Sequence, residues 1–219
     1  MSFFVTPNAD GAFDFTTAGY TLFVLLFICL LLLGSALFGS KKKMNIKQLT
    51  FSAMAIALGV ITSMIKIIDM PMGGSVTLLS MLFIVLIGYW FGLGAGLTTA
   101  VAYGILQLII DPYILSFPQM MVDYLLGFGA LGLSGIFSNK KHGLIKGYLT
   151  GVLGRYFFTF LSGWIFFGMY APDTFPNAAV YSLAYNGCYI GAEALITLII
   201  IALPPVAKAL DTVKRQAAA

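Results

Sequence analysis

Charge is scarce in this sequence of 219 residues. Only 9% of the residues are Asp, Glu, Lys or Arg, whereas 60% are hydrophobic, and the mean hydropathy is +0.97. A soluble domain of this size cannot bury so much apolar surface. The composition therefore excludes a water-soluble protein and predicts an all-α integral membrane protein.

Several chemical groups are also rare or missing. The two cysteines, Cys29 and Cys188, lie in apolar segments without metal-ligand spacing, so we expect small core residues and no metal site. The sequence contains no G-x-x-x-x-G-K-[ST] phosphate loop. If the protein drives uphill transport, the energy must come from elsewhere, and no cofactor is expected.

One short string is similar to an enzyme motif. "GLSG" at residues 132–135 resembles the serine motif of rhomboid intramembrane proteases. A serine nucleophile needs a base within hydrogen-bond reach, but the only histidine, His142, lies in a basic loop. We therefore predict that Ser134 is a packing residue and that the protein is not an enzyme.

Long hydrophobic runs fill most of the chain. A membrane-spanning helix needs about 20 mostly apolar residues, and the sequence offers seven candidates, at 18–39, 48–68, 76–91, 94–110, 119–138, 144–168 and 178–207. The first is uniformly apolar and lacks the basic n-region of a signal peptide, so we expect a retained helix. The other six carry Gly, Ser, Thr and Tyr, as helices that pack together do.

These differences divide the chain into two predicted parts. Residues 1–43 comprise an extracellular segment, one extra transmembrane helix and a basic cytoplasmic linker. Residues 44–219 form a six-helix membrane domain. Ten of the twelve basic residues lie after the first, fifth and last spans: Lys41, Lys42, Lys43, Lys47, Lys140, Lys141, Lys146, Lys208, Lys214 and Arg215. Because basic loops stay in the cytoplasm, the N-terminus is expected outside and the C-terminus inside.

Four ionisable residues fall within or near the ends of the six later spans: Lys66, Asp123, Arg155 and Glu193. Burying a charge in a bilayer costs a few kcal/mol or more, so such residues usually face a cavity or a partner. Asp123 is expected about one turn below the outer surface, as a ligand contact. Arg155 and Glu193 are expected halfway down their helices, where an Arg–carboxylate pair would hold the helices together.

Aromatic residues gather in the same outer half of the bundle. They are Tyr113, Tyr124, Trp164, Phe167, Tyr170, Tyr181 and Tyr185, with Asn186 beside them. Trp164 and Tyr170 also fit an interfacial aromatic belt. A carboxylate among aromatic faces suits a flat organic cation, through charge pairing and cation–π attraction.

Two further stretches predict function. In "MPMGGSVTLLSM", residues 70–81, a turn at Pro71, Gly73 and Gly74 is expected to be a lid, with Ser75 or Thr77 capping the next helix. The alternative is a plain tight turn. In "FSAMAIALGV", Ala53 and Ala57 form a small-xxx-small step that lets another helix approach closely.

Taken together, five strings resemble one membrane protein family. They are "KIIDMPMGGSVTLLSM", "GILQLIIDPYIL", "DYLLGFGALGLSGIF", "RYFFTFLSGWIFFGMYAP" and "YSLAYNG". In this order they are similar to the thiamine-specific substrate-binding (S) component of energy-coupling factor (ECF) transporters, the ThiT/YuaJ family, over about residues 48–207. The resemblance implies a six-helix S component that binds thiamine outside the cell and works with a transmembrane subunit and two ATPases.

The resemblance also implies individual roles. It assigns the ligand site to Asp123, Tyr124, Tyr113, Tyr181, Asn186, Thr159, Phe167 and Gly163 and the partner interface to Ala53 and Ala57, while the lid predicted from the turn comprises Gly73, Gly74 and Ser75. Relatives have His, Trp and Glu where this chain has Thr159, Phe167 and Asp123. Another cationic heteroaromatic ligand therefore stays an alternative, as does a stand-alone ion-coupled carrier with Asp123, Glu193 and Arg155 as its relay.

Overall fold

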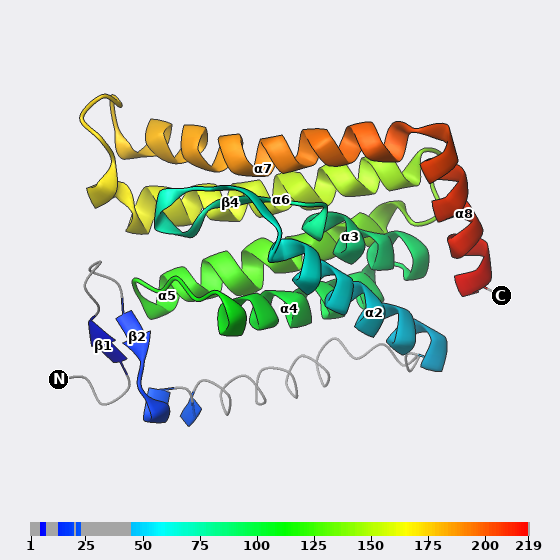
Figure 1. Ribbon diagram of the computed structural model, residues 1–219, viewed down its shortest axis with the longest axis horizontal. Helices are drawn as coiled ribbons and strands as arrows, with labels where there is room; N and C mark the ends of the chain where they lie inside the picture. The colour runs from blue at the N-terminus through cyan, green and yellow to red at the C-terminus, as the bar shows by residue number, and fades with distance from the viewer. Residues whose placement is uncertain (1–4, 8–12, 20, 23–44, 219) are drawn as a thin grey trace.

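The computed structural model describes residues 5–7, 13–19, 21–22 and 45–218. The main helices run alongside one another in a bundle (Figure 1), and their bounds are α2 (Ile46–Ser63), α3 (Ser80–Phe91), α4 (Leu93–Ile110), α6 (Gly143–Phe166) and α7 (Ala178–Ala202). The predicted all-α class is confirmed. Most of the expected helix over 18–39 and of the separate part at 1–43 lies outside the described residues, which there comprise a small hairpin of β1 (Val5–Pro7) and β2 (Phe13–Phe15) and the short helical stretches 17–19 and 21–22.

One continuous helical rod carries three kinds of helix. It runs from Phe117 to Phe137 as α5 (Phe117–Met120), the π-helix η2 (Met121–Gly127) and the 3-10 helix η3 (Ala130–Phe137). Within the described residues, four helices are long and apolar enough to cross a membrane: α2, α4, this rod and α7. α3 is shorter, at 12 residues.

Two predicted spans extend too far at their C-terminal ends, and the span predicted at 76–91 starts too early, because α3 begins only at Ser80. α2 ends at Ser63, and the next residues form the strand β3 (Lys66–Asp69), because the β-branched residues around Lys66 favour extended backbone. α7 ends at Ala202, because Pro204 and Pro205 cannot continue its hydrogen bonding. The chain then turns into α8 (Pro204–Ala218), which crosses the end of the bundle (Figure 1).

Glycines allow the closest helix contacts. A Cβ atom on Gly132 of η3 would lie 2.5 Å from Leu97 Cα of α4, and one on Gly104 of α4 would lie 2.1 Å from the Tyr124 carbonyl oxygen. Real Cβ atoms do not approach backbone this closely, so only glycine lets these helices pack here. Ser134 is buried in the same region and donates to Val85 O at 2.9 Å, as a packing residue should.

The connection between α2 and α3, predicted as a turn, contains two strands as well. β3 pairs antiparallel with β4 (Ser75–Thr77), and the 3-10 turn η1 (Pro71–Gly73) joins them. We call residues 66–77 the lid segment. The prediction that Ser75 or Thr77 caps α3 is wrong, because the helix begins after Leu79, which adopts the left-handed conformation. Ser75 and Thr77 both belong to β4; Thr77 Oγ1 lies 2.7 Å from Ser80 Oγ, a side-chain hydrogen bond, but neither residue caps a backbone N–H of α3.

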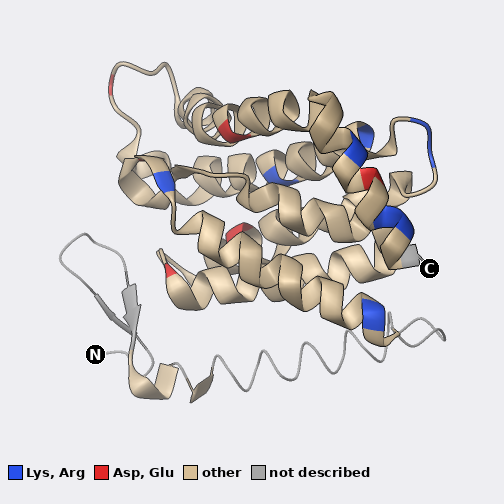
Figure 2. Ribbon diagram, turned by 45° about the vertical axis from the view of Figure 1, so that its right-hand side comes forward, with Lys and Arg blue, Asp and Glu red and all other residues tan. Residues whose placement is uncertain are grey.

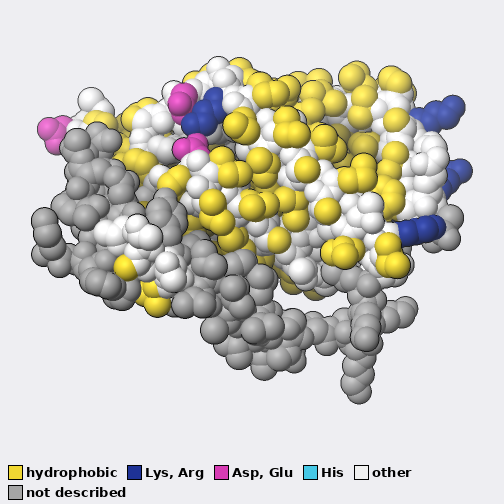
Figure 3. Space-filling view, turned by 60° about the horizontal axis from the view of Figure 1, so that its bottom comes forward, with side chains coloured by type: hydrophobic (Ala, Val, Ile, Leu, Met, Phe, Trp, Pro, Cys, Tyr) yellow, Lys and Arg dark blue, Asp and Glu magenta, His cyan; other side chains and the backbone are white. Residues whose placement is uncertain are grey.

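Hydrophobic side chains cover the middle of the face in Figure 3, and the charged side chains visible there lie towards its two ends. Cys188 belongs to the outer surface of the bundle, since it is exposed on α7. The expectation that it is a small core residue is therefore wrong, while Cys29 lies outside the described residues. An apolar girdle between charged ends is the arrangement that a bilayer requires.

Candidate functional site

A cavity opens between the helices at the end of the bundle where the lid segment lies. Every residue predicted for the ligand site and the lid lines it: Gly73, Gly74, Ser75, Tyr113, Asp123, Tyr124, Thr159, Gly163, Phe167, Tyr181 and Asn186. The lid segment, the rod, α6 and α7 each contribute walls. The structure thus brings together, in one cavity, residues that lie more than 100 positions apart in the sequence.

Asp123 lies on η2 and is partly buried. A π-helical turn contains more residues than an α-helical one, which changes the direction in which its side chains point, and such turns are frequent at functional sites. The amide nitrogen Nε2 of Gln119 donates to Asp123 Oδ2 at 2.6 Å. The carboxylate is therefore held by a neutral donor, and its negative charge is kept on the cavity wall.

Tyr124 has a role that the sequence did not indicate. Its hydroxyl donates to Asp111 O at 3.0 Å and accepts from Tyr113 N at 2.8 Å. It thereby fixes the segment between α4 and α5, and so the position of the Tyr113 ring. That ring stacks on Phe167 with centroids 5.8 Å apart and planes 27° apart. Tyr113 and Phe167 together form a flat aromatic wall.

α6 and α7 supply further lining residues of the cavity. Asn186 is buried; its Nδ2 donates to Ser182 O at 2.9 Å, and its Oδ1 accepts from Tyr189 Oη at 3.0 Å. A Cβ on Gly163 would lie 2.3 Å from Ser182 Oγ, so glycine permits the close approach of α6 to α7. Thr159 donates to the carbonyl of Arg155 in its own helix, as threonine often does in membrane helices.

Arg155 and Glu193 both line the cavity, but the expected pair between them is absent among the described residues. The Arg155 guanidinium lies 3.9 Å from the centre of the Phe128 ring, a cation–π contact. Glu193 instead accepts from Thr77 Oγ1 at 2.6 Å, Ser80 Oγ at 3.0 Å and Met81 N at 3.1 Å. These three donors from β4 and α3 satisfy the buried carboxylate, so it needs no cation. Because Thr77 belongs to the lid segment, Glu193 also ties that segment to α7.

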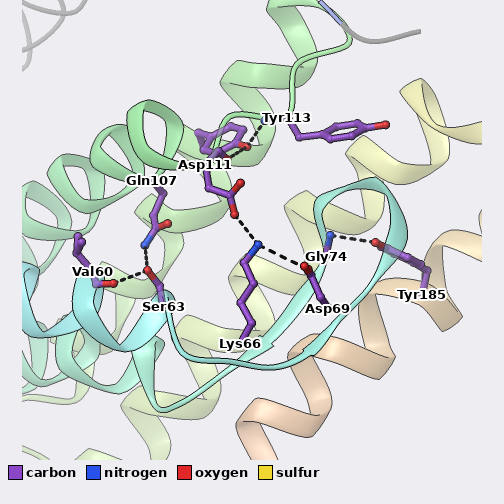
Figure 4. Close-up of polar contacts among 10 residues, drawn as sticks. Val60, Ser63, Lys66, Asp69, Gly74, Gln107, Asp111, Tyr113 and Tyr185 are labelled. Carbon is purple, nitrogen blue, oxygen red and sulfur yellow. Dashed lines mark hydrogen bonds and ion pairs between the residues drawn. The ribbon is translucent and has the colours of Figure 1, made fainter. Parts of the chain in front are cut away.

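The tip of the lid segment is fastened to α7 as well. Tyr185 Oη accepts from Gly74 N at 3.0 Å (Figure 4) and also donates to Pro71 O. Tyr181, one turn earlier on α7, donates to Met72 Sδ at 3.8 Å. With Glu193, these contacts recur along one side of the helix and make α7 the firm attachment of the lid segment.

The other edge of the lid segment has an exposed cluster of charges. Lys66, which was expected near the end of a span, lies on β3 and pairs with Asp111 at 2.9 Å and with Asp69 at 3.6 Å (Figure 4). The hydrogen bond with Asp111 raises the pKa of Lys66 above its usual value. Side-chain exposures of 32% for Lys66 and 62% for Asp111 limit what the pair contributes, because water and salt screen it.

Sequence reasoning missed several residues of the cavity, among them Gln119, Gln107, Tyr103 and Tyr189. Gln107 donates to Ser63 Oγ at 2.8 Å and to Tyr103 Oη at 2.6 Å, joining α4 to the end of α2 (Figure 4). A buried glutamine in an apolar span is itself a signal, because it needs partners there. By contrast, Trp164 is half exposed, stacks on Phe160 and does not line the cavity, as the belt alternative predicts.

Ala53 and Ala57 lie apart from the cavity. Both are exposed on the outer face of α2, one helical turn from each other. Exposed large apolar residues of the same helix surround them, namely Leu49, Met54, Leu58 and Ile61. The small pair therefore forms a shallow step on an apolar helix face.

Comparisons with known proteins point to one family. The thiamine transporter ThiT of Bacillus subtilis is 34% identical over 166 residues, which cover 69% of this chain and 84% of that protein. ThiT of Lacticaseibacillus paracasei is 29% identical over 116 residues, covering 45% and 57%. A solved structure of ThiT from Listeria monocytogenes shares the fold, with a TM-score of 0.60 and 24% identity over 72% of this chain and 94% of that one. The family described as "Thiamine transporter protein (Thia_YuaJ)" matches residues 49–212, most of the chain, and the protein belongs to it.

Proposed function

We propose that this chain is the substrate-binding component of an ECF-type transporter and that it binds thiamine in the cavity beneath the lid segment. One observation carries the proposal. A carboxylate, Asp123, lies in a cavity that also contains the stacked rings of Tyr113 and Phe167. Thiamine carries its positive charge on a flat thiazolium ring, and such an environment stabilises this ring by charge pairing and by cation–π attraction.

The orientation follows from charge. Lysines gather at the end of the bundle that carries α8, while the cavity opens at the other end (Figure 2). By the positive-inside rule, the α8 end faces the cytoplasm and the cavity faces outward in a multi-pass bacterial membrane protein. The N-terminus would then lie outside. Reactivity of single cysteines at 173 and 212 towards an impermeant maleimide on whole cells tests this, with only position 173 expected to react.

The identity of the ligand has a direct test. Thr159 stands where the family resemblance implies an imidazole, and its hydroxyl donates within its own helix, so the site has fewer free donors than the resemblance implies. We expect mass spectrometry of the small molecule that co-purifies with the protein to find thiamine. If another cationic heteroaromatic molecule is found instead, the proposed transporter class stands but the proposed substrate is wrong.

Movement of the lid segment should control ligand exchange. A Cβ on Gly74 would lie 2.4 Å from Tyr185 Oη, so Gly74→Ala displaces the hydroxyl from its two lid contacts. Each neutral hydrogen bond contributes about 1 kcal/mol. We expect thiamine to dissociate roughly fivefold to thirtyfold faster in stopped-flow fluorescence, depending on whether one or both contacts are lost, and Tyr185→Phe to act in the same direction.

Gly94→Ala is the matched control, because among the described atoms none lies within 4 Å of the added Cβ. Gly73 differs from Gly74, since it needs glycine for its positive φ of 83° as well as for space. Dissociation at the parent rate in both Gly74→Ala and Tyr185→Phe would mean that the segment is only a connection.

The ion pair at the other edge should have a smaller effect. An exposed pair contributes about 0.2–1 kcal/mol, so Lys66→Met should speed dissociation less than about fivefold, and added salt should reduce the difference. Because the pKa of Lys66 is raised, the pair persists through neutral and mildly alkaline pH and is lost only when the pH passes that raised value. If Lys66→Met releases thiamine at the parent rate at low salt, the pair has no part in closure.

A further inference from the structure

The buried side-chain amide of Gln119 contacts both the Asp123 carboxylate and the backbone of the segment that carries the Tyr113 ring. Gln119 lies on α5, one turn before Asp123, and only 1% of the residue is exposed. Its Nε2 donates to Asp123 Oδ2 at 2.6 Å and to Tyr113 O at 3.1 Å, and its Oε1 accepts from Leu115 N at 2.9 Å. A flipped amide would oppose like partners at all three contacts, so the network fixes its orientation.

The chemistry of this donor matters. A lysine or arginine at this place would neutralise Asp123 and remove the charge that a cationic ligand needs. A neutral amide orients the carboxylate and leaves its charge in place. The guanidinium of Arg155, which lines the same cavity, is held against Phe128 instead.

Gln119 also sets the distance between the Asp123 carboxylate and the aromatic wall. Because the amide also binds the Tyr113 and Leu115 backbone, it sets the position of the Asp123 carboxylate relative to the segment that carries the Tyr113 ring. Tyr124 holds that segment from the other side. The spacing between the negative charge and the aromatic wall is therefore fixed before any ligand arrives, and preorganisation of this kind strengthens binding by reducing the ordering that binding requires.

We propose that Gln119 is the positioning residue of the ligand site: it aims Asp123 and fixes its distance from the aromatic wall, and so favours cations over uncharged ligands of the same shape. The inference rests on the proposed thiamine site. It adds a residue that does not need to touch the ligand to control selectivity for charge.

The test is a double-mutant cycle read with two ligands. Calorimetry would measure thiamine and deazathiamine, whose five-membered ring is uncharged, on the parent, Gln119→Leu, Asp123→Asn and the double variant. We expect Gln119→Leu to weaken thiamine about tenfold or more and deazathiamine much less. In the Asp123→Asn background, the same substitution should have little further effect on thiamine.

Gln119→Asn gives a second reading if Gln119→Leu folds poorly, because it keeps an amide that is one methylene too short to span the three partners. Ligand-free melting temperatures control for folding. Equal losses for both ligands, with no coupling to Asp123, would mean that Gln119 is merely structural and would overturn the inference. Unchanged thiamine binding in both Gln119 variants, with binding weakened by Asp123→Asn, would overturn it and leave the site intact. Failure of the parent to bind thiamine would overturn the proposed function and this inference with it.

Discussion

Asp123→Asn is expected to weaken thiamine binding by roughly 10–150-fold. The substitution keeps the shape of the side chain, and the amide oxygen that it introduces can accept from Gln119 as the carboxylate does, so the network of Tyr113 and Leu115 stays in place. What is lost is the charge. A charge-assisted contact in a partly dehydrated cavity contributes about 1.5–3 kcal/mol, which corresponds to that range of affinity.

Two comparisons separate this effect from a general disturbance. Asp173→Asn makes the same chemical change on the exposed segment between α6 and α7 and should bind as the parent does. Deazathiamine should lose much less affinity than thiamine on Asp123→Asn, because its uncharged ring makes no charge pair with Asp123. If calorimetry finds parent affinity for thiamine in folded Asp123→Asn, this carboxylate is not a ligand contact.

Replacing Ala53 and Ala57 together by Trp is expected to abolish uptake and leave binding intact. Both alanines lie on the exposed face of α2, away from the cavity. Two indole rings there would stop another helix from approaching closely, whereas they would not disturb ligand contacts. Uptake of labelled thiamine by cells that supply the ECF transmembrane subunit and ATPases should fall to background, while the purified variant binds thiamine as the parent does.

The matched control places the same pair of residues on another exposed helix face. Leu195 and Ile199 of α7 are 61% and 58% exposed and are also one turn apart, so Leu195→Trp with Ile199→Trp adds similar bulk towards lipid. Uptake should survive in this control. Normal uptake in the Ala53 and Ala57 variant would place the partner elsewhere, and full uptake by the chain alone in proteoliposomes without ATPases would argue for a stand-alone carrier.

Much of the site could be predicted because its residues are chemically unusual for their surroundings. An aspartate in an apolar span is costly, so Asp123 was conspicuous, and the strings around it carried the family resemblance. The expectation that the glycine-bearing spans pack closely together holds at some glycines only. Gly96 and Gly104 do make close contacts, but Gly92 and Gly94 have open space beside them among the described atoms.

The rest depends on geometry that composition does not encode. A π-helical turn leaves no clear pattern in "MVDYLLG", so the direction in which Asp123 points was not predictable. Glu193 was expected to pair with Arg155, because a buried carboxylate most simply needs a cation; the structure supplies two hydroxyls and a backbone N–H instead. The role of Gln119 is not predictable from the sequence, because it depends on a loop, carrying Tyr113 and Leu115, that folds back onto the Gln119 side chain.

The most direct test of the central claim is a structure of the purified protein determined with thiamine bound. The account predicts thiamine in the cavity beneath the lid segment, with its positively charged ring facing the Asp123 carboxylate and next to the stacked rings of Tyr113 and Phe167. Thiamine bound outside this cavity, or bound within it with its charged ring turned away from Asp123, would contradict it.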